Sequence, residues 1–293
     1  MPSNRIFYAS KGISIDDNFV PGVQSVALGT SFDVSAIPEL CGTGVYTSYV
    51  KDTSVEVTVN RLVESSTIYS GNINDNRTRG DRKICIAVGE EPQDSESLLE
   101  TASSIKCTGL YINNVSYQMS TDSFLTEAIT FVGGNKSIGD CSVQPVYSGA
   151  DETNLKTRAY FSLENSILPS NINNKIIQSI NTGVDFNFTS IKELGARKSF
   201  KRYASTIIEA YCDIEVLLTT PDLNDSTDIL NETSPCDNQI FDEYTIKLDF
   251  CGIVIDLGEH CRLVDIQFRE GDVGGGNAVL AYKYKSFNFF NVT

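Results

Sequence analysis

Apolar and polar residues alternate along much of this chain, the pattern of strands that bury one face. Three stretches show it most clearly. Their apolar positions, which we expect to face a core, are Val55, Val57 and Val59 in SVEVTVNRL, Cys212, Ile214, Val216 and Leu218 in YCDIEVLL, and Leu280, Tyr282 and Tyr284 in NAVLAYKYKSF. In the last stretch, lysines occupy the opposite face.

Four further stretches read as strands: LYINNVSYQM, EAITFVG, YTIKLDFCGIVID and RLVDIQFRE. Polar and glycine-containing stretches predict turns at 120–123, 256–260 and 271–277. Helix signals are few. Ser190 with Glu193 predicts a capping box for a short helix that Gly195 would end, and a second helix is expected near 95–102. The chain is therefore predicted to be mainly β.

Residues 22–49 and 176–203 resemble each other at a fixed offset of 154 residues, with no gap. The identical pairs are Gln24 and Gln178, Ser25 and Ser179, Gly29 and Gly183, Phe32 and Phe186, Ile37 and Ile191, Glu39 and Glu193, Leu40 and Leu194, and Tyr49 and Tyr203. Such self-similarity indicates a duplicated architecture. Weaker matches pair 104–117 with 245–258 and 125–134 with 263–272.

The stretch 139–175 is polar, rich in Ser and Asn, and long for a connection inside one compact domain. We therefore predict a first domain at 1–140, an interdomain linker at 141–172 and a second domain at 173–293. A second polar stretch, 219–239, is expected to be an exposed loop of the second domain.

The formal net charge of the 293 residues is −15, which argues against ordinary nucleic-acid binding because an acidic surface repels phosphate. No stretch has the length of a membrane span, and the N-terminus lacks the apolar segment of a signal peptide. The eight Cys form no C-x-x-C pair, and the single His cannot complete a common zinc set. We expect most of these thiols to be free and buried.

No catalytic motif is found in the sequence: there is no P-loop, no G-x-S-x-G and no H-E-x-x-H. The glycine-rich stretch 272–278 precedes an alternating strand, which favours a β-turn or bulge over a phosphate site. His260 is interpreted as a turn residue. We therefore expect neither an enzyme nor a cofactor or metal site.

Four stretches, in order, resemble the major tail tube proteins of tailed bacteriophages. They are PGVQSVALGTSFDVSAIPELCGTGVYTSYVKDTSVEVTVNRLV, YINNVSYQMSTDSFLTEAITFVGGNKSI, IKELGARKSFKRY and IDLGEHCRLVDIQFREGDVGGGNAVLAYKYKSFN. Together they extend from about residue 20 to the C-terminus. The chain departs from the family pattern at Ser123, where a turn glycine is common, and at Cys41, Cys212 and Cys251.

The resemblance implies two tandem tail-tube domains of the β-sandwich or barrel type, each with a short flanking α-helix. It implies a structural virion protein, made in the host cytoplasm, that polymerises into stacked rings of a hollow tube. Its partners would be itself, the tape-measure protein and phage DNA in the lumen, with a sheath as a further candidate. It implies no membrane binding. Three copies of a duplicated chain would supply the six domains of a ring, giving a trimer with pseudo-sixfold symmetry.

We expect the lumen to be acidic, since a basic wall would hold DNA. The residues predicted at assembly contacts are Gln24, Ser25, Phe32, Tyr49, Gln178, Ser179, Phe186, Tyr203, Gly274, Gly275, Gly276 and Asn277. Two alternatives remain open at this point. One is a related ring-forming tail component, such as a tail terminator or baseplate hub, and the other is a tandem β-sandwich binding module or enzyme.

Overall fold

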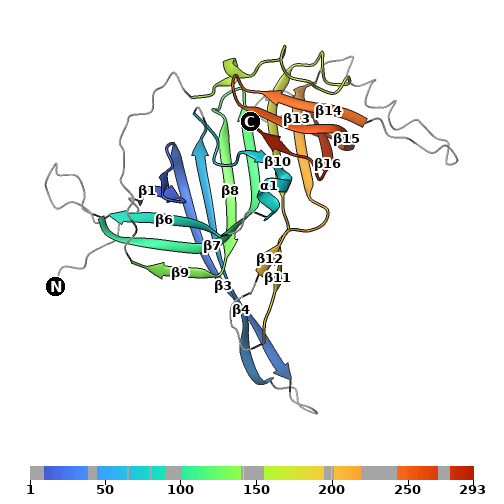
Figure 1. Ribbon diagram of the computed structural model, residues 1–293. Helices are drawn as coiled ribbons and strands as arrows, with labels where there is room; N and C mark the ends of the chain where they lie inside the picture. Colours follow the sequence, from blue (N-terminus) through green and yellow to red (C-terminus); the bar gives the residue numbers. More distant parts are fainter. Residues whose placement is uncertain are drawn as a thin grey trace.

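The computed structural model describes residues 10–38, 45–64, 66–78, 81–89, 101–139, 141, 155–194, 199, 201–218, 243–269 and 278–293. Its described part is mainly β and is built around one large antiparallel sheet (Figure 1). The predicted mainly β fold class is therefore confirmed. The three clearest alternating stretches form strands whose expected core positions are buried, apart from the half-buried Leu218.

The first half of the chain holds β1 to β9 and the single α-helix of the described residues. Their bounds are β1 Ser10–Ile15, β2 Asn18–Phe19, β3 Val23–Pro38, β4 Val45–Leu62, β5 Gly71–Asn72, α1 Ile73–Thr78, β6 Arg82–Gly89, β7 Thr101–Ser120, β8 Thr126–Gly133 and β9 Asn135–Ile138. The far end of the long hairpin β3–β4 projects from the body (Figure 1).

The second half begins with a 3-10 turn at Arg158–Tyr160 and contains eight strands. These are β10 Ile177–Asp185, β11 Thr189–Ile191, β12 Lys201–Tyr203, β13 Glu209–Leu217, β14 Glu243–Asp249, β15 Val254–Arg269, β16 Val279–Phe287 and β17 Asn291–Val292. The short hairpin β11–β12 forms a separate two-stranded sheet.

Eight strands follow one another across the large sheet in the order β3-β4-β8-β7-β10-β13-β16-β15. The first four belong to the first half and the last four to the second. The long strands β7 and β15 each continue past the row, where they pair with β6 and β9, and with β14 and β17, respectively. Both contain a glycine with positive φ, Gly109 (68°) and Gly258 (83°), near the change of partner.

The two halves therefore repeat one pattern of pairing. The corresponding strands are β3 and β10, β4 and β13, β6 and β14, β7 and β15, β8 and β16, and β9 and β17. The offset of 154 residues also relates individual backbone pairs: Ser35 pairs with Tyr49, and Thr189 pairs with Tyr203.

The correspondence extends to the segment before the repeated strands. Ile13 of β1 pairs with Ile86 of β6, and Ile167, at the same offset of 154, bridges to Lys247 of β14. The Ile167 and Lys247 backbones exchange two hydrogen bonds of 2.8 and 2.9 Å. The segment before β10 thus takes the place that β1 takes in the first half.

One hydrophobic cluster extends through both halves, from Ile13 in β1 to Val292 in β17. Leu168 and Ile172, from the stretch expected to be a linker, are buried in it. The domain boundaries at 1–140, 141–172 and 173–293 stay a prediction, and the loop 219–239 lies outside the described residues.

Some local predictions are wrong. Ser190 is in β11, not in a helix, because Thr189–Ile191 pair with Lys201–Tyr203 and tertiary pairing overrides the capping-box signal. Residues 101 and 102 of the second expected helix are in β7, and 95–100 lie outside the described residues. The expected turn at 256–260 is part of β15, which bends at Gly258, and His260 is therefore a strand residue.

The weaker sequence matches are displaced by one strand. They aligned the stretch of β7 with that of β14 and the stretch of β8 with the second part of β15. The pairing pattern makes β15 the counterpart of β7 and β16 that of β8. Alternating strands resemble one another at any even shift, so a weak alignment between them is easily displaced.

Candidate assembly interface

The two halves meet along a backbone joint between β7 and β10. Seven residues of each strand pair, from Asn114 with Asp185 to Ser120 with Ser179. The Asn114 side-chain amide donates a hydrogen bond to the Asp185 carboxylate across the joint. Beyond the ladder, the Phe186 amide donates to the Asn113 carbonyl at 2.9 Å. The joint therefore continues one sheet from the first half into the second.

A buried ionic network lies beside this joint in the first half. Arg61 Nε donates to Glu127 Oε2 at 2.6 Å, and the two side chains are 3% and 0% exposed. The backbone amides of Ile68 and Tyr69 donate to the same carboxylate, at 2.9 to 3.1 Å. The Tyr117 hydroxyl donates to it at 2.8 Å. The charge is therefore paired and hydrogen-bonded, as a buried carboxylate requires.

The network holds in place the segment from Ile68 to Asn72, which contacts the second half and is called the link below. The Tyr69 ring lies 6.2 Å from the Phe186 ring and 5.9 Å from the Phe290 ring, centroid to centroid. Directly after it, β5 pairs with β17. Burial raises the pKa of the Tyr69 and Tyr117 hydroxyls above the ordinary range, so both stay protonated. The halves are thus held together at a second place.

Two long edges of the eight-stranded row have no strand partner among the described residues. They are the outer edge of β3 and the outer edge of β15 from residue 263 to 269. On the core face of both edge strands, apolar residues that pack against the core are only half-buried. These are Val26 and Leu28 on β3, and Leu263 and Ile266 on β15. Such edges invite pairing with another chain.

Large exposed apolar side chains occur at the same two edges. Phe32 of β3 is 61% exposed, and Phe268 of β15 is 51% exposed. Val34 and Val264 are also more than half exposed. A cluster of this kind on both free edges is typical of an interaction surface.

The residues predicted at assembly contacts lie in different parts of the chain. Gln24, Ser25 and Phe32 lie on the free edge strand β3, whereas Gln178, Ser179 and Phe186 belong to β10 or directly follow it at the internal joint. The backbone of Tyr49 lies in β4, and Tyr203 is an exposed residue of β12. Gly274, Gly275, Gly276 and Asn277 lie outside the described residues. Their proposed role at assembly contacts stays a prediction.

Sequence reasoning missed the edge of β15 and the buried ionic network. A signal for the network exists, since Arg61 continues the core phase of Val57 and Val59. Glu127 likewise shares a strand face with Ile129. A charged residue in the apolar phase of a strand indicates a buried pair.

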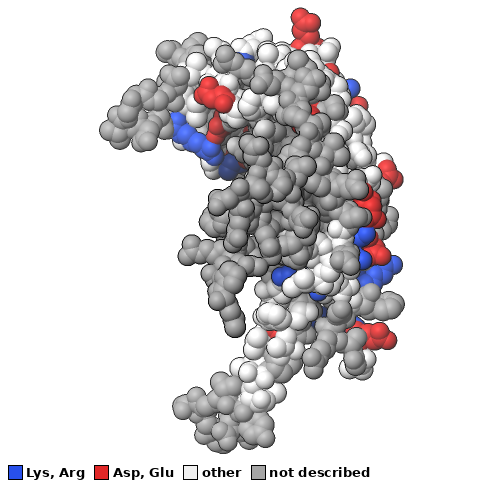
Figure 2. Space-filling model, turned by 90° about the vertical axis from the view of Figure 1, so that its left-hand side faces the viewer, with Lys and Arg blue, Asp and Glu red and all other residues white. Residues whose placement is uncertain are grey.

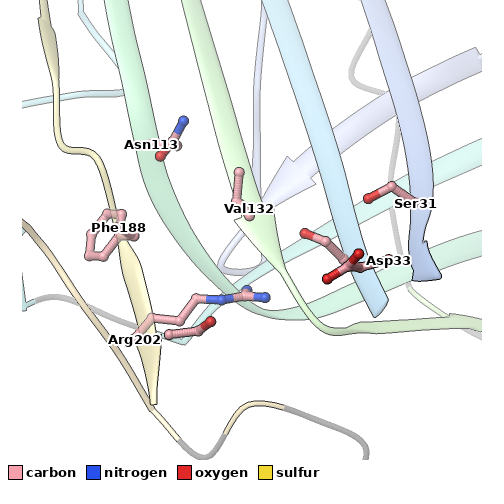
Figure 3. Close-up of a pocket in the computed structure, with 8 residues that line it drawn as sticks. Ser31, Asp33, Asn113, Val132, Phe188 and Arg202 are labelled. Carbon is pink, nitrogen blue, oxygen red and sulfur yellow. The ribbon is translucent and has the colours of Figure 1, made fainter. Parts of the chain in front are cut away.

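Two open grooves are found among the described residues. One, of about 260 Å³, lies between residues of both halves and is lined by Ser31, Asp33, Ser54, Asn113, Val132, Phe188, Ser190 and Arg202. Figure 3 shows the Arg202 side chain extending across this groove toward Asp33. The other, of about 370 Å³, follows β3 and is lined by residues 27–31 together with Glu56 and Thr58.

Charged side chains gather along one margin and the top of the body in the view of Figure 2, with acidic and basic residues interleaved. His260 Nδ1 lies 2.5 Å from a Glu243 oxygen on the surface, and Arg262 donates to the same carboxylate at 2.8 Å. The hydrogen bond from Arg262, followed by that of His260, lowers the pKa of Glu243. This arrangement is a cluster of ionisable side chains on the surface.

Six cysteines are described, and all are free thiols: Cys85, Cys107, Cys141, Cys212, Cys251 and Cys261. Burial raises the pKa of Cys85 to about 12 and that of Cys261 to about 11, which keeps these thiols protonated and unreactive. Within the described part of the chain, no group of His, Cys, Asp or Glu residues could hold a metal ion. None of its helices has the length and apolar character needed to cross a membrane.

Neither a protein-family model nor a curated protein matches this chain.

Proposed function

We propose that this chain is a structural subunit of a hollow tube, as in the tail tubes of bacteriophages that the sequence resembles. Copies would join into rings, the rings would stack, and DNA would pass through the lumen during ejection. One observation carries the proposal: the strand order of the first half recurs in the second, within a single continuous sheet. Each half is thus one building unit, and the chain already contains one joint between two units.

A joint that links unlike edges can be repeated from one unit to the next. Such head-to-tail contacts form a closed ring when the rotation per unit divides a full turn, and a helix when it does not. Closure also removes the exposed edges that a free sheet leaves. With two tandem tail-tube domains in each chain, three chains would form a trimeric ring with pseudo-sixfold symmetry.

The face of the row that lies opposite the core suits a lumen for DNA. Side chains that alternate with the core positions are mostly small and polar in the first half, such as Ser116 and Thr130. In the second half they include charged residues. On the eight paired strands, the acidic residues of this face whose side chains are described are Asp33, Glu56, Asp185, Glu209, Asp213, Glu215 and Asp265, and the basic ones are Arg262, Arg269, Lys283 and Lys285. A wall with a surplus of acid would let DNA slide.

The test is the mass and shape of the concentrated protein. Native mass spectrometry of the full chain should give three subunits of 32.1 kDa for a single ring, and negative-stain images should show rings or tubes. Six chains within one ring, counted from the symmetry of the ring images, would contradict the pairing of halves as ring units. Protein that stays monomeric at the highest attainable concentration, with no rings in the images, would contradict the function itself.

A further inference from the structure

We propose that copies of this chain join by pairing β15 of one copy with β3 of the next, in the register that the β7–β10 joint already defines. The inference rests on the proposed function and adds the edges, the register and the residues that make the contact. The occupant of each free edge is thus a second copy of this chain. Within the described residues, these two edges are the counterparts of the two strands of the internal joint.

The register follows from the pairing on either side of the joint. β7 has one irregularity against β8, between Ile112 and Asn114, and β15 has one against β16, between Leu263 and Asp265. Aligning the two irregularities makes Ile266 the counterpart of Val115 and Phe268 that of Tyr117. β10 and β3 correspond at the offset of 154 residues, because Ile180 pairs with Ile214 as Val26 pairs with Val59.

The internal joint then predicts the contacts between copies. In the chain, Asn114 pairs with Asp185, Val115 with Val184, Ser116 with Gly183 and Tyr117 with Thr182. The equivalent contacts between copies are Asp265 with Ser31, Ile266 with Thr30, Gln267 with Gly29 and Phe268 with Leu28. On the core face Phe268 would meet Leu28 and Ile266 would meet Thr30, and polar or small residues would meet on the other face.

A pair of glycines supports this assignment. At the internal joint, a Cβ on Gly183 would collide with the Val115 carbonyl oxygen and approach the Ser116 Cα to 3.0 Å. Only glycine therefore allows β7 to lie so close to β10. Gly29 is the counterpart, yet the nearest atoms to a Cβ there belong to Glu56, at 4.0 Å. Nothing described within the chain requires a glycine at this position, whereas a strand packed like β7 would.

Aromatic residues at the internal joint are buried, whereas their counterparts on the free edges are exposed. Phe186 is fully buried beside the internal joint, and its counterpart Phe32 is 61% exposed. Tyr117 is fully buried, and its counterpart Phe268 is 51% exposed. The groove of about 370 Å³ runs along residues 27–31 of β3, where the incoming strand would lie. Pairing with a second copy would cover all of these features together.

Matched glycine variants test the edges. Gly29→Ala should leave the thermal unfolding of the monomer unchanged and abolish ring formation by native mass spectrometry. Gly183→Ala should instead lower the thermal midpoint, because the collision is inside the chain. Gly134→Ala is the control, since a Cβ there meets nothing within 4 Å and Gly134 is on neither edge. Normal rings from Gly29→Ala would overturn the proposed contact.

Cysteine pairs test the register. Ser31→Cys with Asp265→Cys should form disulfides between copies under mild oxidation, giving linked species up to three chains on a non-reducing gel. Ser25→Cys with Asp265→Cys, on the same face but out of register, should form none. Rings without the 31–265 cross-link would reject the register and leave the proposed function standing. Absence of any oligomer in the parent protein would reject the function.

Discussion

On the core face, three paired residues of neighbouring strands include a buried charged pair in the first half, whereas the three equivalent residues of the second half are apolar. These two sets, called ladders below, are Arg61–Glu127–Tyr117 and Val216–Leu280–Phe268. On the opposite face of the same strands, the chemistry is reversed. There the ladders are Thr58–Thr130–Asn114 in the first half and Asp213–Lys283–Asp265 in the second.

The comparison shows that backbone pairing, and not side-chain chemistry, is what the two halves share. In the first half the core charge has a task, since Glu127 holds the link that carries Tyr69 into the other half. In the second half, the apolar row of Val216 and Leu280 ends at Phe268, which is exposed. The same positions therefore serve an internal joint in one half and an open edge in the other. The following substitutions test this, in order of decreasing effect on the free energy of unfolding.

Glu127→Leu should cause the largest loss, because it leaves Arg61 buried and unpaired. Breaking one partner of a buried pair costs about 3–5 kcal/mol. Chemical denaturation of the monomer measures this. Arg61→Val, Tyr117→Phe and Glu127→Leu together copy the ladder of the second half and remove the unpaired charge, so the triple variant should be more stable than the single one. A single variant within about 1 kcal/mol of the parent would refute the role of the network.

Tyr117→Phe should cost less, since it removes one hydrogen bond to a charged acceptor, worth about 1.5–3 kcal/mol. The comparison variant, at a buried tyrosine of the second half that is not the counterpart of Tyr117, is Tyr284→Phe, which removes the 2.9 Å hydrogen bond to the neutral Asn171 side chain. A neutral bond contributes about 0.5–1.5 kcal/mol. Urea titrations with equal slopes should rank the two variants in this order, and the reverse order would contradict the charged character of the first-half ladder.

Asp213→Asn should change the pH dependence more than the stability itself. Burial, the largest cause, raises the pKa of Asp213 above its ordinary value of 3.8. The folded state then binds more protons than the unfolded state, so this contribution is present below pH 3.8 and is lost as pH rises through the raised pKa. The variant should flatten the fall in stability over that range. At neutral pH its effect should stay within about 1 kcal/mol.

Thr58→Val at the counterpart position is the control for this experiment. It removes the 3.1 Å hydroxyl contact with Thr130 and no ionisable group. Thermal unfolding followed across the mildly acidic range should show the parent slope for Thr58→Val and a smaller slope for Asp213→Asn. Equal slopes in all three proteins would show that the protonation of Asp213 does not contribute to the pH dependence of stability.

Phe268→Ser should have the smallest effect on the monomer, within about 0.5 kcal/mol, because half of the ring is already exposed. Its effect should instead appear in sedimentation velocity at high concentration, as a loss of the ring species. Phe287→Ser, at a similarly exposed position of β16, is the control and should retain rings. Loss of rings in both variants would argue for general surface hydrophobicity over a specific edge.

The duplication was visible in the sequence because the repeated strands kept identities without a gap. The pairing of Ser35 with Tyr49 and of Thr189 with Tyr203 follows the same offset. The internal joint was not visible, since Ser116 and Asn181 resemble any solvent-facing strand residues. Which strands become neighbours depends on long-range pairing, which alternation alone does not specify.

The failed helix near Ser190 has a related cause. Its signals are local, whereas the backbone of Thr189–Ile191 is satisfied by pairing with Lys201–Tyr203. The bend at Gly258 gave the opposite error, because a glycine in a polar stretch suggested a turn where the strand only changes direction. Both errors concern the choice between local and distant hydrogen-bond partners, which sequence pattern leaves undecided.

The link that carries Tyr69 has a mechanical consequence. Pulling the halves apart would require breaking two separate sets of backbone hydrogen bonds, those between β7 and β10 and those between β5 and β17. It would also require separating the Tyr69 side chain from Phe186 and Phe290. In the proposed ring, every second seam would be of this reinforced kind and the others would form between separate molecules. Outward pressure from a genome in transit would then strain the seams between molecules first, and a failing tube would shed whole chains.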